Sequence, residues 1–201
     1  MHQDNSGSGG PAVVGRRGDD DAFGVTVVLV ADDDPTVTDE IVSLLESEYE
    51  VRTAYDSADA IAGLDAAVSV VLLDPDLAGL SARHVLDRVT SEAVDCQVAA
   101  LLDAERDLTG TAFDASLVKP VAPNELRETV DRLARRAAYR TALSEYYALA
   151  EEYATRSSDD PERDHVGARL DDLRAQLDEV FGTLDTREAY DTALRELRSD
   201  S

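Results

Sequence analysis

Three apolar runs of this chain end in charged residues that together could form and hold an acyl phosphate. Asp32 and Asp33 follow the first run, Asp74 follows another, and Lys119 follows the last. Carboxylates crowded around one point repel one another unless a cation joins them, and Mg²⁺ favours such oxygen ligands. A carboxylate could then attack phosphorus, with the lysine neutralising the phosphoryl charge.

Lys119 is the strongest of these signals, because it is the only lysine of the 201 residues. The carboxylates carry less weight taken singly. A lone aspartate after a strand, such as Asp74, is more often a turn or helix cap than a nucleophile. An aspartate triplet also occurs at residues 19–21, where no strand precedes it. The triplet at residues 32–34 therefore indicates a site only in combination with Asp74 and Lys119.

The residues that position these groups alternate between apolar runs and segments with helical periodicity. The runs cover residues 25–31, 51–55, 70–73, 98–102 and 117–118. The first run is mostly β-branched, which is typical of a strand buried on both faces. Five strand–helix units predict an α/β fold with a doubly wound parallel sheet, whose chemistry lies beyond the carboxyl ends of its strands.

The pattern changes after Pro120 to almost continuous helix. A helix starting at Pro123 and unbroken to about residue 155 would be about 50 Å long, at about 1.5 Å per residue. A second helix carries a four-three apolar spacing from Val166 to Leu184, and a further apolar segment follows at residues 189–197. We therefore predict a flexible tail at 1–23, an α/β domain at 24–121, and a helical hairpin or coiled coil at 122–201.

The composition indicates a halophilic cytoplasm, with 43 acidic against 19 basic residues and a net charge of −24. Cys96 is the only cysteine, which excludes an intramolecular disulfide and fits a reducing compartment. Arg16 and Arg17 precede an apolar run, but that run is too short for an export signal. No stretch has the length of a transmembrane helix, so we expect a cytoplasmic protein without membrane contact.

Three motifs in order resemble the receiver domains of two-component response regulators. They are VLVADDDP at residues 28–35, VVLLD at 70–74 with Gly79 beyond it, and LVKPV at 117–121. The resemblance implies a flavodoxin-like fold of five strand–helix units, a Mg²⁺ cofactor, and a sensor histidine kinase as phosphodonor. It implies a signalling protein and not an enzyme that turns over a substrate.

Carried over residue by residue, the resemblance gives each polar position a role. Asp74 would accept the phosphoryl group and Lys119 would pair with it. Asp33 would bind Mg²⁺ directly, Asp32 would orient a metal-bound water, and Asp76 would offer its backbone carbonyl to the metal.

Two positions depart from the family. Its receivers carry a Thr or Ser at the end of the fourth strand, which contacts the phosphoryl group and lets an aromatic residue of the fifth strand turn inward. Here those switch positions hold Leu102 and Ser116, and the connection at 104–114 looks short enough to truncate the fourth helix. The alternative is therefore a degenerate pseudo-receiver that binds partners without being phosphorylated.

The helical part, from Pro123 through Tyr139 and Tyr146, resembles the HalX domain that follows receivers in haloarchaea. This resemblance rests on helix pattern, position and acidic composition, and it implies no biochemical role. We expect this part to self-associate or to bind a protein partner.

Two other functions have weaker support in the sequence. Asp74-Pro75-Asp76 is similar to the Asp-x-Asp of haloacid-dehalogenase-type phosphatases, but that motif normally follows the first strand. A basic stretch on the long helix raises the possibility of DNA binding; it comprises Arg127, Arg132, Arg135, Arg136 and Arg140. Acidic residues interleave it and no helix-turn-helix pattern follows, so nucleic-acid binding is not expected.

Overall fold

The computed structural model describes residues 26–79, 82–91, 96–106, 108, 110–157 and 160–183. The tail predicted at 1–23, the first residue of the apolar run at 25–31, and the segment at 189–197 lie outside these ranges. So do Leu184 and the side chain of Val180 in the predicted apolar seam.

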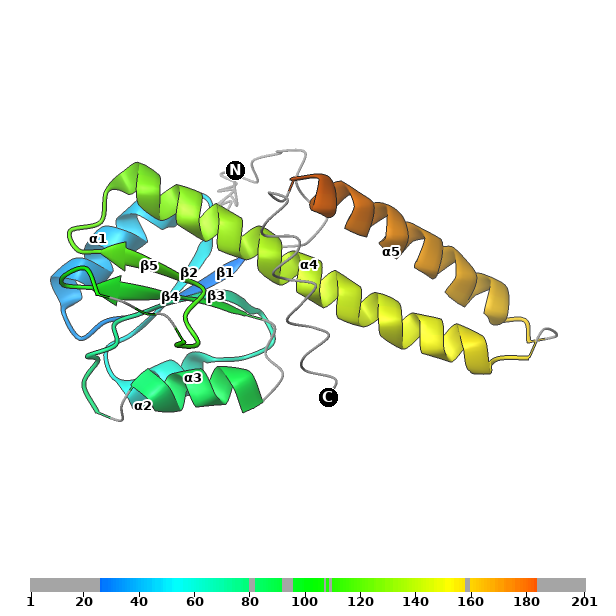
Figure 1. Ribbon diagram of the computed structural model, residues 1–201, viewed down its shortest axis with the longest axis horizontal. Helices are drawn as coiled ribbons and strands as arrows, with labels where there is room; N and C mark the ends of the chain where they lie inside the picture. The colour runs from blue at the N-terminus through cyan, green and yellow to red at the C-terminus, as the bar shows by residue number, and fades with distance from the viewer. Residues whose placement is uncertain are drawn as a thin grey trace, which may run out of the picture.

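A five-stranded parallel sheet forms the centre of the first part of the chain (Figure 1). Its strands are β1 (Val27–Ala31), β2 (Glu50–Ala54), β3 (Val68–Leu73), β4 (Gln97–Leu102) and β5 (Ala115–Val118), in the order β2-β1-β3-β4-β5. This confirms the predicted doubly wound sheet. The strand order reverses between β1 and β3, and this is where ligands bind in such sheets.

Helices cover both faces of the sheet. Helix α1 (Pro35–Leu45) and the first turns of α4 (Pro123–Thr155) pack on one face, where Ile41 and Leu126 meet Val28 and Val30. Helices α2 (Ser57–Gly63) and α3 (Ala82–Ser91) pack on the other, as Figure 1 shows. β1 is buried over its whole length, as its β-branched sequence predicted.

The fourth strand–helix unit differs from the other four. Between β4 and β5, the described residues 103–106, 108 and 110–114 form turns and bends and no helix. The predicted shortening of this connection is therefore confirmed, and the five-unit pattern is complete in its strands but not in its helices.

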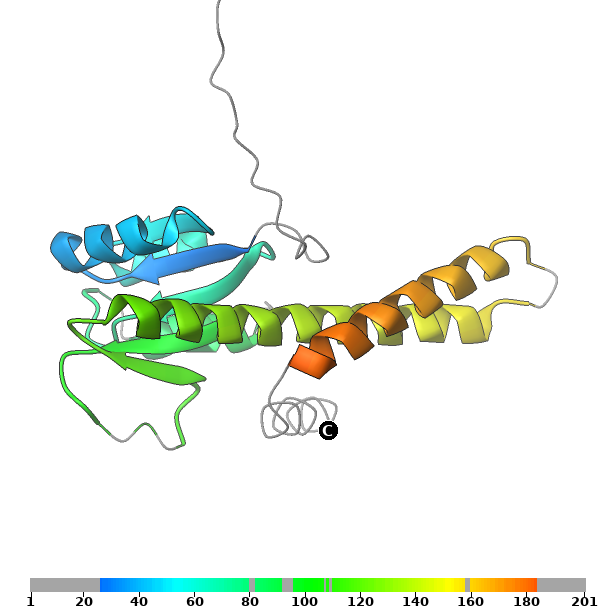
Figure 2. The ribbon, with the colours of Figure 1, turned by 90° about the horizontal axis from the view of Figure 1, so that it is seen from above.

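Helix α4 belongs to two hydrophobic cores (Figure 2). Leu126, Val130 and Leu133 are fully buried against the sheet. Farther along, Ala142 and Leu149 pack against α5 (Arg163–Thr183) through residues that include Val166, Leu173 and Leu177. The predicted helical hairpin is thus formed within one chain.

The α/β core consequently extends beyond the change of sequence pattern at Pro120. The domain limits predicted at 23/24 and 121/122 mark where the sequence pattern changes, and they stay predictions. Among the described helices, none combines the length and the apolar character that crossing a bilayer requires.

The phenol of Tyr49, in the turn between α1 and β2, holds α4 by donating a hydrogen bond to Asp131. Burial and this hydrogen bond raise the pKa of Tyr49 above its usual value. The folded state therefore keeps the proton more tightly than the unfolded chain. The resulting stability is present below the usual phenol pKa of about 10 and is lost as the pH rises through the raised value.

We expect Tyr49→Phe to lower the free energy of unfolding by about 1 kcal/mol at neutral pH, because Asp131 loses its donor. The variant should also lose less stability than the wild type between pH 10 and the raised pKa. Urea unfolding at several pH values checks both effects. Identical pH profiles for the two proteins would contradict this role of Tyr49.

Candidate functional site

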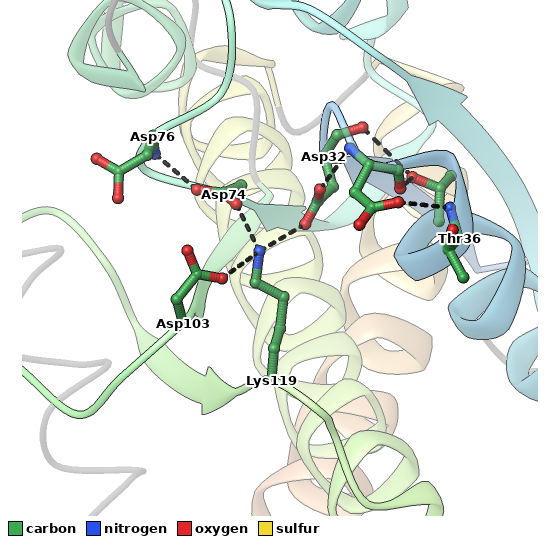
Figure 3. Close-up of polar contacts among 8 residues, drawn as sticks. Asp32, Thr36, Asp74, Asp76, Asp103 and Lys119 are labelled. Atoms are coloured by element: carbon green, nitrogen blue, oxygen red, sulfur yellow. Dashed lines mark hydrogen bonds and ion pairs between the residues drawn. The ribbon is translucent and has the colours of Figure 1, made fainter.

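The backbone of the sheet places three charged residues at one edge. Each residue lies one position beyond its strand and continues the hydrogen-bond ladder. The amide of Asp32 donates to Ala54 O (3.2 Å). In the same way Asp74 N donates to Ala31 O (2.8 Å) and Lys119 N donates to Leu102 O (2.7 Å). The strand ends thus bring together the three positions that the sequence singled out (Figure 3).

The three aspartates after β1 lie in three different environments. Asp32 is fully buried, and its Oδ1 accepts the amide hydrogen of Asp34 (2.9 Å). Asp33 is exposed. Asp34 caps α1, because its Oδ1 accepts the amide hydrogen of Thr36 (2.8 Å) and Pro35 follows at the first helical position.

Asp74 is 5% exposed and uses both carboxylate oxygens. Its Oδ1 accepts the amide hydrogen of Asp76 (2.6 Å), and its Oδ2 lies 2.6 Å from the ammonium of Lys119. The side chain therefore has a fixed orientation at the end of a buried strand. A nucleophilic carboxylate needs such positioning.

Lys119 contacts three carboxylates, at the ends of three different strands. Its Nζ lies 2.6 Å from Asp74 Oδ2, 2.9 Å from Asp103 Oδ1 and 3.1 Å from Asp32 Oδ2. Burial alone would lower the pKa of Lys119, but the hydrogen bonds to Asp74, Asp103 and Asp32 outweigh it and raise the pKa above the usual value. The ammonium stays charged, as pairing with a phosphoryl group requires.

Asp103 is the site residue that the sequence reasoning missed. It directly follows β4, just as Asp32 follows β1 and Asp74 follows β3. Its side chain is 78% exposed, whereas that of Asp32 is 1% exposed. The signal that could have found it is the rule used for the other strands, that the residue ending each apolar run faces the site.

The carboxylates of Asp32, Asp33 and Asp74 fit a divalent cation. Each offers one oxygen, and these oxygens all lie within 4.8 Å of one another. Hard carboxylate oxygens at this spacing suit Mg²⁺, which completes its octahedron with water. The role given to the Asp76 carbonyl stays a prediction.

The side chain of Asp76 does not take the place of a second catalytic acid beside Asp74. Its carboxylate is exposed and pairs with Arg106 at 3.6 Å, in the β4–β5 connection. In the haloacid-dehalogenase-type phosphatases, which the Asp74-Pro75-Asp76 motif resembles, the second aspartate acts as the general acid. This geometry therefore favours the signalling function over turnover of a phosphate ester.

The two switch positions lie on the sheet where the sequence placed them. Leu102 is buried at the end of β4 and pairs in register with Val118, while Ser116 is exposed on β5 and pairs with Ala100. Both line a hollow at the surface. Leu102 offers no side-chain hydrogen bond, and Ser116 carries no ring that could fill the hollow.

Two arginines of the basic stretch on α4 bind within the domain. Arg127 donates to Leu44 O (3.2 Å) at the end of α1 and pairs with Glu48 at 3.6 Å. Arg136 is buried. Arg127 thus docks the helix on the α/β core, and neither of these two side chains belongs to an exposed basic face for phosphate contacts.

The chain is similar in sequence to known regulatory proteins. A Haloferax volcanii protein, whose name proposes a transcriptional regulator, is 37% identical over 157 residues, which are 77% of this chain and 27% of that protein. A response regulatory protein of Vibrio vulnificus is 35% identical over 127 residues, 60% of this chain and 52% of its own length. The chain thus spans about a quarter to a half of these relatives.

The signal receiver domain of a Vibrio parahaemolyticus protein superposes with a TM-score of 0.53 at 20% identity, covering 59% of this chain and 97% of that domain. At this identity the likeness concerns the fold alone. The model of the response regulator receiver domain matches residues 28–131, which include the acidic cluster, Lys119 and the first turns of α4. With the site geometry described above, this match shows that the chain belongs to the response regulator receiver domain family.

Proposed function

We propose that this protein is the phosphoacceptor of a two-component relay, receiving a phosphoryl group from a sensor histidine kinase on Asp74. The observation that carries the proposal is the 2.6 Å contact between Asp74 and Lys119 beside the carboxylates of Asp32 and Asp33. Nucleophile, counter-charge and metal ligands thus lie within one small volume, which is what acyl-phosphate formation needs.

In the proposed transfer, a carboxylate oxygen of Asp74 attacks the phosphorus of a phosphohistidine on the kinase. The O–P bond forms as the P–N bond breaks, and the imidazole leaves with the electron pair. The products are an aspartyl phosphate and a histidine. Lys119 holds the attacking carboxylate in place and pairs with the charge of the transferred group.

Asp33 and Asp74 would hold Mg²⁺ through their carboxylates and Asp76 through its backbone carbonyl, while Asp32 would orient a metal-bound water. When bound, the ion would neutralise charge on the phosphoryl oxygens and keep the carboxylates from repelling the incoming group. Asp32 is already oriented for this task by the amide of Asp34.

The output would pass through the helical hairpin of α4 and α5. Because α4 contributes to the α/β core at Leu126 and to the hairpin core at Leu149, one helix joins the two parts mechanically. We propose that this part is a HalX-like domain that self-associates or binds a protein partner. We also propose a halophilic cytoplasm as its setting. The Haloferax volcanii relative supports a haloarchaeal setting, but it extends far beyond this chain.

The test is incubation of the purified protein with acetyl phosphate in multimolar KCl, with Mg²⁺ or with EDTA. We expect the mass of one phosphoryl group to appear with Mg²⁺ and to disappear on brief exposure to alkali, as acyl phosphates hydrolyse. With EDTA the gain should fall at least tenfold, since the carboxylates then repel the donor. An equal gain in EDTA, or an alkali-stable one, would contradict the proposal.

A second candidate function is a pseudo-receiver that binds partners without phosphorylation. Leu102 and Ser116 favour it, because neither provides the contacts by which the family reports phosphorylation. The same experiment separates the two functions, since a pseudo-receiver gains no mass under any of these conditions.

A further inference from the structure

The ammonium of Lys119 is already surrounded by three carboxylates in this structure. A lysine ammonium carries three N–H donors. Asp32 and Asp74 accept hydrogen bonds from Nζ at 3.1 and 2.6 Å, and Asp103 forms an ion pair with it at 2.9 Å, so three carboxylates share one ammonium. Phosphorylation on Asp74, the function proposed above and the one on which this inference rests, would bring new anionic oxygens to the same ammonium. One of the present partners has to leave.

Asp103 is the partner that can leave at the smallest cost. Asp32 is fully buried, and its second oxygen is bound by the amide of Asp34. Asp74 carries the phosphoryl group itself. The side chain of Asp103 is 78% exposed, so water can replace the lysine around its carboxylate.

The charge balance also favours the departure of Asp103 from Lys119. An aspartyl phosphate carries more negative charge than the aspartate it replaces. Besides the Mg²⁺ proposed above, the cluster would then hold that group, Asp32 and Asp103 around a single ammonium. Repulsion between the phosphoryl oxygens and Asp103 adds to the competition for Lys119, and Asp103 relieves it by turning into solvent.

Asp103 also begins the stretch that a phosphorylation signal could move. Residues 103–106 are held to the site by two charge pairs, Asp103 with Lys119 and Arg106 with Asp76 (3.6 Å). Figure 3 shows Asp103 pointing at the ammonium from the side opposite Asp32. The described residues of this connection form no helix that would fix them by regular packing.

We propose that Asp103 is a built-in competitor of the phosphoryl group: its carboxylate pairs with the Lys119 ammonium in the resting protein, and phosphorylation of Asp74 displaces it and frees residues 103–106. The exchange of one anion for another on Lys119 would replace the coupling that Leu102 and Ser116 do not provide. Asp103 is a positioning residue in this scheme, because it acts through Lys119.

The test uses beryllium fluoride with Mg²⁺ as the phosphoryl mimic, on the full chain. Binding is followed by ¹⁹F NMR, and amide hydrogen exchange is followed over residues 103–106. In the wild type we expect the mimic to speed exchange in this stretch. In Asp103→Ala the amides of residues 103–106 should exchange fast before the mimic is added, and their exchange rates should not change after it is added.

Affinity gives an independent readout. Removing the competitor should lower the half-saturating mimic concentration about two- to fivefold, the range that an exposed ion pair supports. Asp103→Asn should fall between Asp103→Ala and the wild type, because the amide oxygen is a weaker, neutral acceptor. Glu105→Gln is the matched control, since it removes one exposed charge from the same stretch without a contact to Lys119, and it should behave as the wild type.

The outcomes separate this inference from the function on which it rests. A wild type that binds the mimic with no change over residues 103–106, or equal affinities for the Asp103 and Glu105 variants, would overturn the role of Asp103 and leave the phosphoacceptor intact. Absence of a bound ¹⁹F signal in all variants would contradict both the role of Asp103 and the phosphoacceptor function of Asp74.

Discussion

Asp74→Asn should abolish phosphorylation by acetyl phosphate while leaving the protein folded. The two side chains have nearly the same shape, and the amide oxygen can still accept a hydrogen bond from either the Asp76 amide or the Lys119 ammonium, although it cannot replace both carboxylate oxygens. It cannot act as the carboxylate nucleophile, so the expected loss is complete and not partial. Intact-mass spectrometry and circular dichroism measure the two parts of this prediction.

Asp34→Asn is the matched control for that variant. Asp34 is an aspartate of the same strand-end triplet, but its side chain caps α1 by accepting the amide hydrogen of Thr36. Asparagine caps helices as well as aspartate does. Asp34→Asn should therefore take up the phosphoryl group as the wild type does. Equal losses in the Asp34 and Asp74 variants would show that Asn at this edge disturbs the site in general, and would contradict the specific role of Asp74.

Lys119→Met should cause the largest loss of stability among single changes at the site. It leaves buried Asp32 and nearly buried Asp74 without their counter-charge, and breaking a buried ion pair by removing one partner costs about 3 kcal/mol or more. Urea unfolding at fixed KCl concentration measures the change. Phosphorylation should be lost as well, because the transferred group has no cation opposite the metal ligands.

Magnesium provides a second readout for that variant. Without Lys119 the carboxylates of Asp32, Asp33 and Asp74 attract a divalent cation more strongly, so Mg²⁺ should raise the Tm of Lys119→Met by more than that of the wild type. Lys119→Arg keeps the positive charge and should recover most of the stability, but it places a planar guanidinium where a compact ammonium lies. A Lys119→Met protein as stable as the wild type would contradict the electrostatic account of the cluster.

The sheet and most of the site could be predicted because the sequence carries redundant signals for them. Apolar runs at β1 and β3 are buried over most of their length, and each ends in an aspartate that continues the ladder by one hydrogen bond. Parallel strands place their carboxyl ends at one edge, so the sequence order of Asp32, Asp74 and Lys119 was enough to predict that they meet.

Asp103 could have been found by the same rule, since it follows the buried strand β4. What the sequence could not supply is the direction of the side chain. Asp103 is mostly exposed, and only the three-dimensional position of the Lys119 ammonium shows that it is a partner and not a solvated surface acid.

The place of α4 shows a different limit. Its start at Pro123 and its end near residue 155 were predicted from the sequence and are found in the structure. An amphipathic helix packs equally well on a sheet or on another helix, so periodicity alone does not tell which neighbour covers which turn. The first turns of α4 pack on the sheet and its later turns pack on α5. The α/β core therefore continues into a helix that also belongs to the hairpin.

The central claim, that Asp74 is the phosphoacceptor, is tested most directly by locating the modification. The protein is treated with acetyl phosphate and Mg²⁺, the acyl phosphate is reduced with borohydride, and tandem mass spectrometry finds the residue converted to homoserine. We predict conversion at Asp74 alone, with none at its exposed neighbours Asp33, Asp76 and Asp103, which act as ligand or competitor but do not attack phosphorus. Conversion at any of those three in place of Asp74 would contradict the account.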